Sequence, residues 1–236
     1  MKFKITTLLI AVVCVIALGI VRTNLVKAQT SSLPKHEDAA PPAPRSLIPP
    51  GSDPLLLLQS SDAEQRDNAS VFLGRNYEDM EDKIQSIAEK FLKQSTQRRA
   101  KSPNDPTNQE GNQDDRVAVD SIGMLGEFRS TRSILFLIDH LPLFVFADNA
   151  HGEDAYPCAG ALVSIGSPSL DPLLVKVVQT DDPLTTRLAA YVFVKVLGNN
   201  VGAYFIEDRR SKLTSVVAKR RLDHLEHVVK TEKFPY

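Results

Sequence analysis

The stretch CAGALVSIGSPSLDPLLVKVV, residues 158–178, decides the fold that we predict for this chain. Small and apolar residues run to Ile165, and the segment GSPS, which starts at Gly166, interrupts them. A second apolar run then follows, in which Leu173, Leu174, Val177 and Val178 have helical spacing. Asp171 is a good helix-capping residue, and Pro172 is tolerated in the first turn of a helix. The stretch therefore predicts two helices joined by a turn at a glycine.

Two other stretches, which begin at Arg116 and Thr186, repeat the first part of this pattern. When three glycines are aligned, the residues one, four and eight positions before each are apolar or small, which places them on one helical face. Glycine adopts the left-handed conformation that ends a helix at little steric cost, so we expect each glycine to end a helix. The aligned sets are Gly126, Gly166 and Gly198; Leu125, Ile165 and Leu197; Ile122, Leu162 and Val194; and Ala118, Cys158 and Ala190.

A second apolar segment follows the turn in the other two units as well. In the first unit it contains Ile134, Leu135 and Ile138, and in the third it contains Val201, Phe205 and Ile206, more loosely spaced. The three glycines lie 40 and 32 residues apart. Helix pairs that repeat at such periods indicate an α-solenoid. The fold class predicted for the chain is therefore all-α, a short solenoid of stacked helical hairpins.

The motifs CAGALVSIG, LDPLLVKVV and RLAAYVFVKVLG resemble the HEAT-like repeat family, which is armadillo-type and includes the short repeats first noted in phycobilin-lyase subunits. That family has small residues on its first helix, a Leu-x-x-Ile-Gly end and a proline near the start of the second helix. The unit at 116–138 lacks the proline. The resemblance covers residues 116–210 and implies a fold, but it says almost nothing about function.

A parallel α/β fold is the structural alternative. The runs LFLIDHLPLFVFAD and YVFVKVLG are rich in residues that favour strands. Helical periodicity around the glycines accounts for more residues, so we prefer the all-α prediction.

The N-terminus has the layout of an export signal. Lys2 and Lys4 precede an apolar run at residues 5–21, and Ala28 offers a small-residue cleavage site. The run is also at the lower limit of the length that spans a membrane, so it could remain as an uncleaved anchor. We therefore expect an exported protein that is either periplasmic or extracellular after cleavage, or anchored by residues 5–21.

Composition divides the chain into five segments. Residues 1–28 are the signal or anchor, 29–54 a Pro-rich linker, 55–99 a helical segment, 100–115 a polar loop and 116–236 the repeat domain. Within 55–99, the four residues Met80, Ile84, Ile87 and Phe91 form one apolar stripe of a helix at 77–96. That helix either packs on the domain or forms a short coiled coil. Residues 211–230 predict a final amphipathic helix, with Leu213, Val217, Leu225 and Val228 near one face.

The net charge, the composition and the missing motifs exclude several classes of function. The formal net charge of −1 gives no bulk attraction to nucleic acid, and the absence of Trp weakens the case for a sugar-binding cleft or a base-stacking platform. The two cysteines are Cys14 and Cys158, and cleavage of the signal would leave Cys158 alone, so a disulfide scaffold is excluded. No nucleophile elbow, phosphate loop, zinc-protease helix or dinucleotide fingerprint is present.

One segment, at 141–156, interrupts the repeats with both apolar and polar residues. Its polar residues, with His140 and Cys158 nearby, are of the types that bind metals, but their spacing matches no ligand pattern. We interpret it as a turn between repeats and as the candidate partner-contact loop, with Cys158 as a small core residue. The candidate contact residues are Asp148, His151, Glu153 and Asp154.

Two features near the C-terminus are interpreted as solvent-exposed surface. His224 and His227 lie three residues apart but have no third ligand nearby. A basic cluster is interleaved with acidic residues, which is typical of a mixed surface. Its members are Arg209, Arg210, Lys212, Lys219, Arg220 and Arg221.

We therefore expect an exported, non-catalytic scaffold that binds a protein or peptide of unknown identity and carries no cofactor or metal. One alternative, implied by the family resemblance, is a lyase or chaperone-like chromophore-attachment factor. The other is a structural envelope protein that self-associates through the 77–96 helix. The sequence does not give the oligomeric state.

Overall fold

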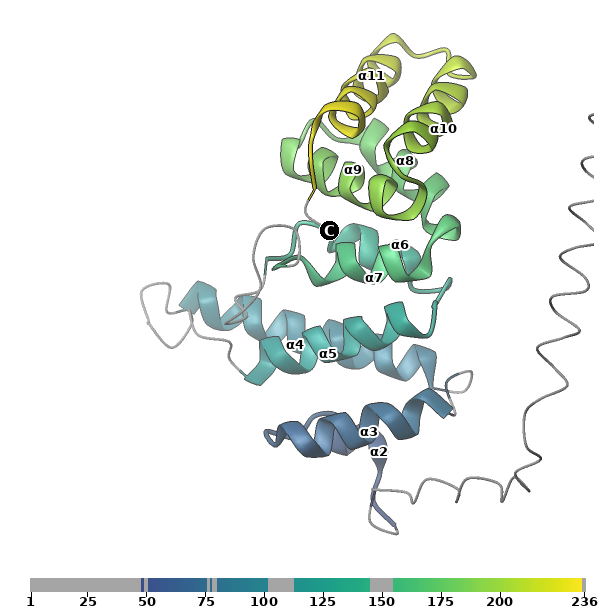
Figure 1. The fold of residues 1–236 in the computed structure, drawn as a ribbon. Coiled ribbons are helices and arrows are strands. Elements are labelled where there is room, and N and C mark those ends of the chain that lie inside the picture. The colour runs from purple at the N-terminus through teal and green to yellow at the C-terminus, as the bar shows by residue number, and fades with distance from the viewer. Residues whose placement is uncertain are drawn as a thin grey trace, which may run out of the picture. The chain divides into compact units, whose positions relative to one another are not determined.

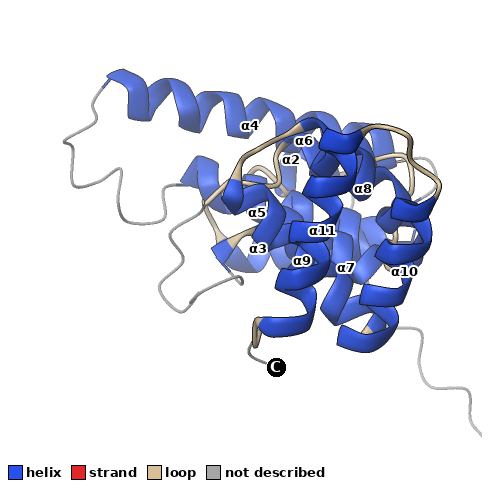
Figure 2. Cartoon of the chain, turned by 90° about the horizontal axis from the view of Figure 1, so that it is seen from above, coloured by secondary structure: helices blue, strands red, loops and turns tan. Residues whose placement is uncertain are grey.

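The computed structural model describes Ile48, Tyr77 and residues 51–75, 80–101, 113–144 and 155–234. The chain divides into residues 1–45 and a second unit, residues 46–236, that contains everything described. All regular secondary structure of these described residues is helical (Figure 2). This confirms the all-α prediction. The α/β alternative is wrong at YVFVKVLG, because residues 191–197 lie inside a helix.

The unit begins with two short helices. Helix α2, Pro54–Leu57, starts at Asp53, whose carboxylate accepts a hydrogen bond from the backbone N–H of Leu55. Helix α3 follows at Ala63–Arg75. Leu58, directly after α2, is fully buried, whereas Leu56 is exposed. Of the four consecutive leucines at residues 55–58, only the last is fully buried, and Leu55 and Leu57 pack partly against the core.

Helix α4, Glu81–Lys101, contains most of the predicted apolar stripe. Ile84, Ile87 and Phe91 are buried, and Met80, just before the helix, packs against the same core. The neighbouring element is α5, Gln113–Glu127, which packs along α4 (Figure 1). The stripe therefore faces the interior of this unit. The helix begins four residues later than predicted and ends five residues later.

Two helical hairpins follow with nearly the same geometry. In the first, α7 at Pro157–Ile165 leads through the 3-10 turn η4, Ser167–Ser169, into α8 at Leu170–Gln179. In the second, α9 at Pro183–Leu197 leads into α10 at Asn199–Ser211. The chain bends by 116° at the first turn and by 117° at the second. The preceding unit, α5 with the short α6 at Ile134–Asp139, has a longer turn.

The first helices of the units pack in sequence. Helix α5 contacts α7, α7 contacts α9, and α9 contacts the last helix, α11, Val216–Thr231 (Figure 1). Helix α6 packs on α7 and α8, while α11 also packs on α8 and α10. The positions aligned in the sequence lie along these contacts. Ala118, Ile122, Leu125, Cys158, Leu162, Ile165, Ala190 and Val194 are buried, and Leu197 is partly buried.

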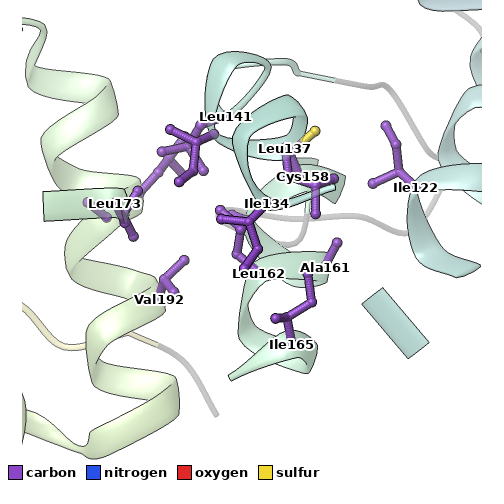
Figure 3. Packing of buried hydrophobic residues seen from close by; sticks show 14 of the residues in the cluster. Ile122, Ile134, Leu137, Leu141, Cys158, Ala161, Leu162, Ile165, Leu173 and Val192 are labelled. Carbon is purple, nitrogen blue, oxygen red and sulfur yellow. The ribbon is translucent and has the colours of Figure 1, made fainter. Parts of the chain in front are cut away.

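Helix α7 lies at the centre of the core. Figure 3 shows Cys158 and Leu162 of α7 among buried side chains from the helices around it. Ile122 comes from α5, Leu137 from α6 and Val192 from α9. The small residues on α7 allow these neighbours to approach closely, as close packing in protein interiors requires.

Two of the three aligned glycines end their helices as predicted. Gly166 has φ 83° and ψ −143°, and Gly198 has φ 76° and ψ 163°. These positive φ values are the region that glycine adopts readily and other residues avoid. The N–H of each glycine closes its helix by donating to a carbonyl four residues earlier, Leu162 or Val194.

The prediction for Gly126 is wrong, because α5 continues through it to Glu127. The left-handed position falls instead on Arg129, at φ 54°. The N–H of Ser130 donates to the carbonyl of Leu125, and that of Arg129 donates to Gly126, which is the Schellman pattern with Arg129 in the usual place of glycine. Gly126 serves packing: a Cβ there would lie 2.7 Å from the Cα of Ala161 in α7.

Several details of the second helices also differ from expectation. Helix α8 starts at Leu170, so Asp171 lies inside the first turn and does not cap it, while Pro172 occupies a first-turn position as predicted. Three residues expected to face the core are exposed because each lies on the outer side of its helix: Leu135, Val201 and Val217. Helix α11 begins at Val216, where the Ser215 hydroxyl accepts a hydrogen bond from the N–H of Ala218.

Candidate interaction surface

A groove crosses the ends of the first helices. It encloses about 640 Å³ and lies between the α5–α6 turn, the α7–α8 turn and the end of α9. We call it the turn groove. It is lined by Arg129, Thr131, Val163, Ser164, Ile165, Gly166, Ser167, Pro168, Lys195 and Val196.

The turn groove has a charged rim and a partly apolar floor. Arg129 comes from the α5–α6 turn, and Lys195 comes from the last turn of α9. Ile165 is buried beneath the groove, with Val163 and Val196 half-buried beside it. Cations are favoured beyond helix C-termini because the last backbone carbonyls carry partial negative charge. The same carbonyls lack partners within the helix and can accept hydrogen bonds from a ligand.

The glycine at the α7–α8 turn shapes this groove. Gly166 carries no side chain, and a Cβ built on it would meet nothing within 4 Å. The turn is held by Ser169, whose hydroxyl lies 2.7 Å from the carbonyl oxygen of Gly166. The wall at residues 166–168 is thus fixed by local hydrogen bonding.

A second groove, of about 270 Å³, lies between α8, α10 and α11. We call it the apolar groove, and its lining residues are Asp171, Leu174, Val175, Val178, Arg209, Lys212, Leu213 and Leu222. Val175 is 55% exposed there. At its rim Arg209 binds Asp171 through two contacts, of 2.8 and 3.1 Å. The hydrogen bond from Arg209 lowers the pKa of Asp171, so this carboxylate stays ionised.

The third cavity, of about 260 Å³, lies beside the start of α9 and is lined in part by Thr180, Thr186, Arg220 and His224. Arg221 and Asp181 also line it, but they already bind each other. The Nε of Arg221 donates to Asp181 at 2.8 Å, and its Nη1 donates to the carbonyl of Val178 at 2.6 Å. Hydrogen bonding by Arg221 lowers the pKa of Asp181. This arginine joins α11 to the α8–α9 turn. Because its charge is already paired with Asp181, it does not make the cavity a binding site for anions.

The basic cluster near the C-terminus is a mixed surface, as predicted. Arg209 pairs with Asp171 and Asp208, Arg210 pairs with Asp223, and Lys212 pairs with Asp208. Arg209 also lies over the ring of Phe205, 4.7 Å from its centroid. The pairs with Asp171 and Asp223 join α10 to α8 and α11, those with Asp208 lie within α10 and its C-terminal cap, and together they partly neutralise the charge.

Cys158 is a core residue, in agreement with its predicted interpretation. Its side chain is fully buried, and burial raises the pKa of the Cys158 thiol to about 12. The ring Nδ1 of His140 lies 2.9 Å from the carbonyl oxygen of Phe136. Within the described part of the chain, no three His, Cys, Asp or Glu side chains gather where they could hold a metal ion.

The four predicted contact residues, Asp148, His151, Glu153 and Asp154, lie outside the described residues. His224 and His227 are both exposed on α11. The expected signal or anchor at residues 5–21 also lies outside the described part. Among the helices that are described, none is alone both long and apolar enough to cross a membrane; two bent pairs, α7 with α8 and α9 with α10, reach the required length and composition only together.

Sequence reasoning missed both walls of the turn groove. Neither Arg129 nor Lys195 is among the residues that the sequence singles out. A signal existed for Arg129, because helices commonly end in a left-handed residue four positions after a buried apolar one, here Leu125. No local signal brings Lys195 close to it.

Comparison of the chain with protein-family models, with curated proteins and with solved structures finds no match.

Proposed function

We propose that this protein is an exported, non-catalytic scaffold that binds a protein or peptide on the surface of a short α-solenoid of HEAT-like hairpins. The observation that carries the proposal is the repetition of one hairpin geometry, with bends of 116° and 117°, in helices that pack in sequence. Stacked hairpins of this kind present a continuous, shaped surface and need no buried polar pocket.

Ion pairs between elements support a rigid scaffold. The Nε of Arg66 in α3 lies 2.7 Å from a carboxylate oxygen of Asp120 in α5, and Lys176 in α8 binds Asp139 in α6 at 2.9 Å. The Arg209–Asp171 and Arg221–Asp181 pairs extend the series towards α11. A surface that is ordered before binding loses less conformational entropy when a partner docks.

The packing of α4 favours this proposal over self-association through the same helix. Ile84, Ile87 and Phe91 are buried within the unit, so a coiled coil would have to remove them from that core. Substitution of Ile87 by Asp separates the two functions. A scaffold loses stability and stays at its native association state, whereas a self-associating protein dissociates. Light scattering coupled to gel filtration, with a substitution at the exposed neighbour, Ser86→Asp, as control, measures the difference.

The direct test is selection of ligands from a random peptide library displayed on phage. The full-length chain, purified in mild detergent, is the target, and its heat-denatured form is used for counter-selection. A scaffold enriches a set of related peptides that bind the folded chain with micromolar or better affinity. Repeated selections that yield no peptide specific for the folded chain would overturn the proposal.

A further inference from the structure

The segment that follows α11 folds back onto α9. It begins at Glu232, where a φ of −76° and a ψ of 140° turn the chain into an extended conformation. A carboxylate oxygen of Glu232 lies 3.2 Å from the Nε of Arg187, and the ring of Phe234 meets the ring of Tyr191 edge-on, with 5.7 Å between the centroids. Figure 1 shows this segment running from α11 past α9. We call residues 232–234 the tail.

The tail and α9 match in their spacing. Alternate side chains of an extended chain lie on the same side, and here Phe234 is 5% exposed and Glu232 partly buried, whereas Lys233 between them is exposed. Two residues of extended chain span about 6.5 Å. The four residues from Arg187 to Tyr191 rise about 6 Å along the helix. The tail therefore presents an acidic and an aromatic side chain, two positions apart, to one stripe of α9.

This stripe of α9 has the chemistry of a peptide-binding site. Tyrosine and arginine are enriched among the residues that contribute most to protein interfaces, where aromatic anchors lie in desolvated contacts. Tyr191 is 7% exposed with the tail in place, and the Nζ of Lys195 lies 5.5 Å from the centroid of its ring. Arg187 lies in the N-terminal half of α9, so the helix dipole does not oppose a carboxylate there.

The tail is attached through contacts that another segment can reproduce. Among the described residues, Lys233 and Phe234 make no backbone–backbone hydrogen bond, so side chains hold the tail in place. One contact is the ion pair of Glu232 with Arg187, whose side chains are 40% and 55% exposed, and an exposed pair contributes little. The other is the ring contact of Phe234. Chain ends also open more readily than packed helices.

We propose that Arg187 and Tyr191 form a docking site for an extended segment of the partner protein in which an acidic residue precedes an aromatic residue by two positions. The tail occupies this site within the same chain until the partner displaces it. This proposal rests on the scaffold function and names the site, the chemistry of its ligand and its regulation. The partner enters only when the tail is released, so its apparent Kd is the intrinsic Kd divided by the fraction of chains with a released tail.

The probe is the hexapeptide TEKFPY, which has the sequence of residues 231–236. It is titrated into the full-length chain in mild detergent, and saturation-transfer difference NMR measures the Kd. Phe234→Ala removes the aromatic anchor of the tail, so the peptide should bind this variant at least about tenfold more tightly than the wild type. Replacing the Phe of the peptide by Ala should abolish binding, and replacing its Glu by Gln should weaken binding about threefold. Replacing the Lys between them should change nothing, because Lys233 is exposed.

Further substitutions in the Phe234→Ala chain place the peptide on α9. Tyr191→Leu keeps an apolar side chain but loses the ring contact, so it should weaken binding about fivefold. Tyr204→Leu, at a position on α10 that is 72% exposed, is the matched control and should leave the Kd unchanged. If Phe234→Ala does not fold, Glu232→Gln takes its place, because it removes only the exposed ion pair. The peptide should then bind about threefold more tightly than to the wild type.

Several outcomes overturn the proposal. Equal binding of the peptide to the wild type and to the folded tail variant would show that the tail does not occupy its site. A wild-type dimer that Phe234→Ala abolishes would make the tail of a second copy the occupant in place of a partner protein. Display-selected peptides that TEKFPY does not displace from the Phe234→Ala chain would leave the scaffold function standing and place its ligand elsewhere. Absence of any specific display peptide overturns the scaffold function, and this proposal with it.

Discussion

Gly126 in α5 lies so close to Ala161 in α7 that a Cβ on the glycine would lie 2.7 Å from the Cα of Ala161. This contact sets the distance between the first helices of two consecutive units. The two residues are 35 positions apart in the chain. The nearest atom to the added Cβ, the Cα of Ala161, belongs to the backbone, so it cannot move aside as the end of a flexible side chain could.

Substitution of Gly126 by Ala should therefore destabilise the fold. The added methyl group forces α5 and α7 apart, and overpacking of this kind costs about 1–3 kcal/mol. Urea unfolding followed by far-ultraviolet circular dichroism measures the change in free energy. Gly123, in the same helix, has nothing within 4 Å of its Cβ position, so Gly123→Ala should stabilise by roughly 0.5–1 kcal/mol. Equal effects of the two substitutions would contradict this account of the contact.

A substitution at Gly166 would strain the backbone without creating a steric clash. Its φ of 83° and ψ of −143° suit glycine alone, although the site has space for a methyl group. Gly166→Ala should cost about 1–3 kcal/mol, all of it from conformation. Gly160→Ala, in the middle of α7 and also in open space, should instead increase stability. If Gly166→Ala melts at the wild-type temperature, the positive φ of Gly166 is not what makes glycine necessary at this helix end.

Arg66 joins α3 to α5. Its side chain is 7% exposed, donates to Asp120, and also donates through Nη1 to the carbonyls of Ser60 and Ser61. Arg66→Ala should cost about 2 kcal/mol, because it leaves these acceptors without a partner. It should also speed amide hydrogen exchange in α2 and α3 before other helices are affected.

The matched control for Arg66 is Arg132. Its side chain is 70% exposed and lies 3.9 Å from Glu81. Arg132→Ala should change stability by less than about 0.5 kcal/mol, as exposed ion pairs usually do. A larger loss for Arg132→Ala than for Arg66→Ala would show that burial is not what makes the Arg66 contacts important.

Cys158 should be inert in the native protein. Burial raises the pKa of its thiol to about 12, and the thiolate is the reactive form. In a Cys14→Ser background, native protein should not react with a thiol reagent at mildly alkaline pH, and protein in concentrated guanidinium chloride should react fully. Rapid reaction of the folded chain would place Cys158 at the surface.

The raised pKa of Cys158 also makes the free energy of unfolding depend on pH, and it should fall as the pH rises. The pKa is higher in the folded state than its ordinary value of 9.0, so the folded state holds the proton more tightly. The stability that the buried, protonated thiol of Cys158 contributes is fully present below about pH 9. It is lost as the pH rises from there towards about 12. Cys158→Ala lacks the titrating group, so its unfolding free energy should fall less than that of the wild type over this interval. A parallel fall in both proteins would exclude Cys158 as the cause.

The local features of the fold were predictable from the sequence. Gly166 and Gly198 end helices because their own backbone conformations do so, and the residues one, four and eight positions earlier are buried because they share a helical face. The second helices were less predictable. Leu135 and Leu137 are equally apolar, yet one is 67% exposed and the other is fully buried, because only one faces α7.

The sequence by itself determined the helices, their turns at glycine and the small, apolar face that each unit buries, because helix periodicity and backbone preferences act over a few residues. Only the tertiary structure decided that Gly126 is a contact point and not a helix end, and that Arg129 and Lys195 line one groove. Those relationships join segments that lie far apart in the chain, and the packing of α5, α7 and α9 brings them together.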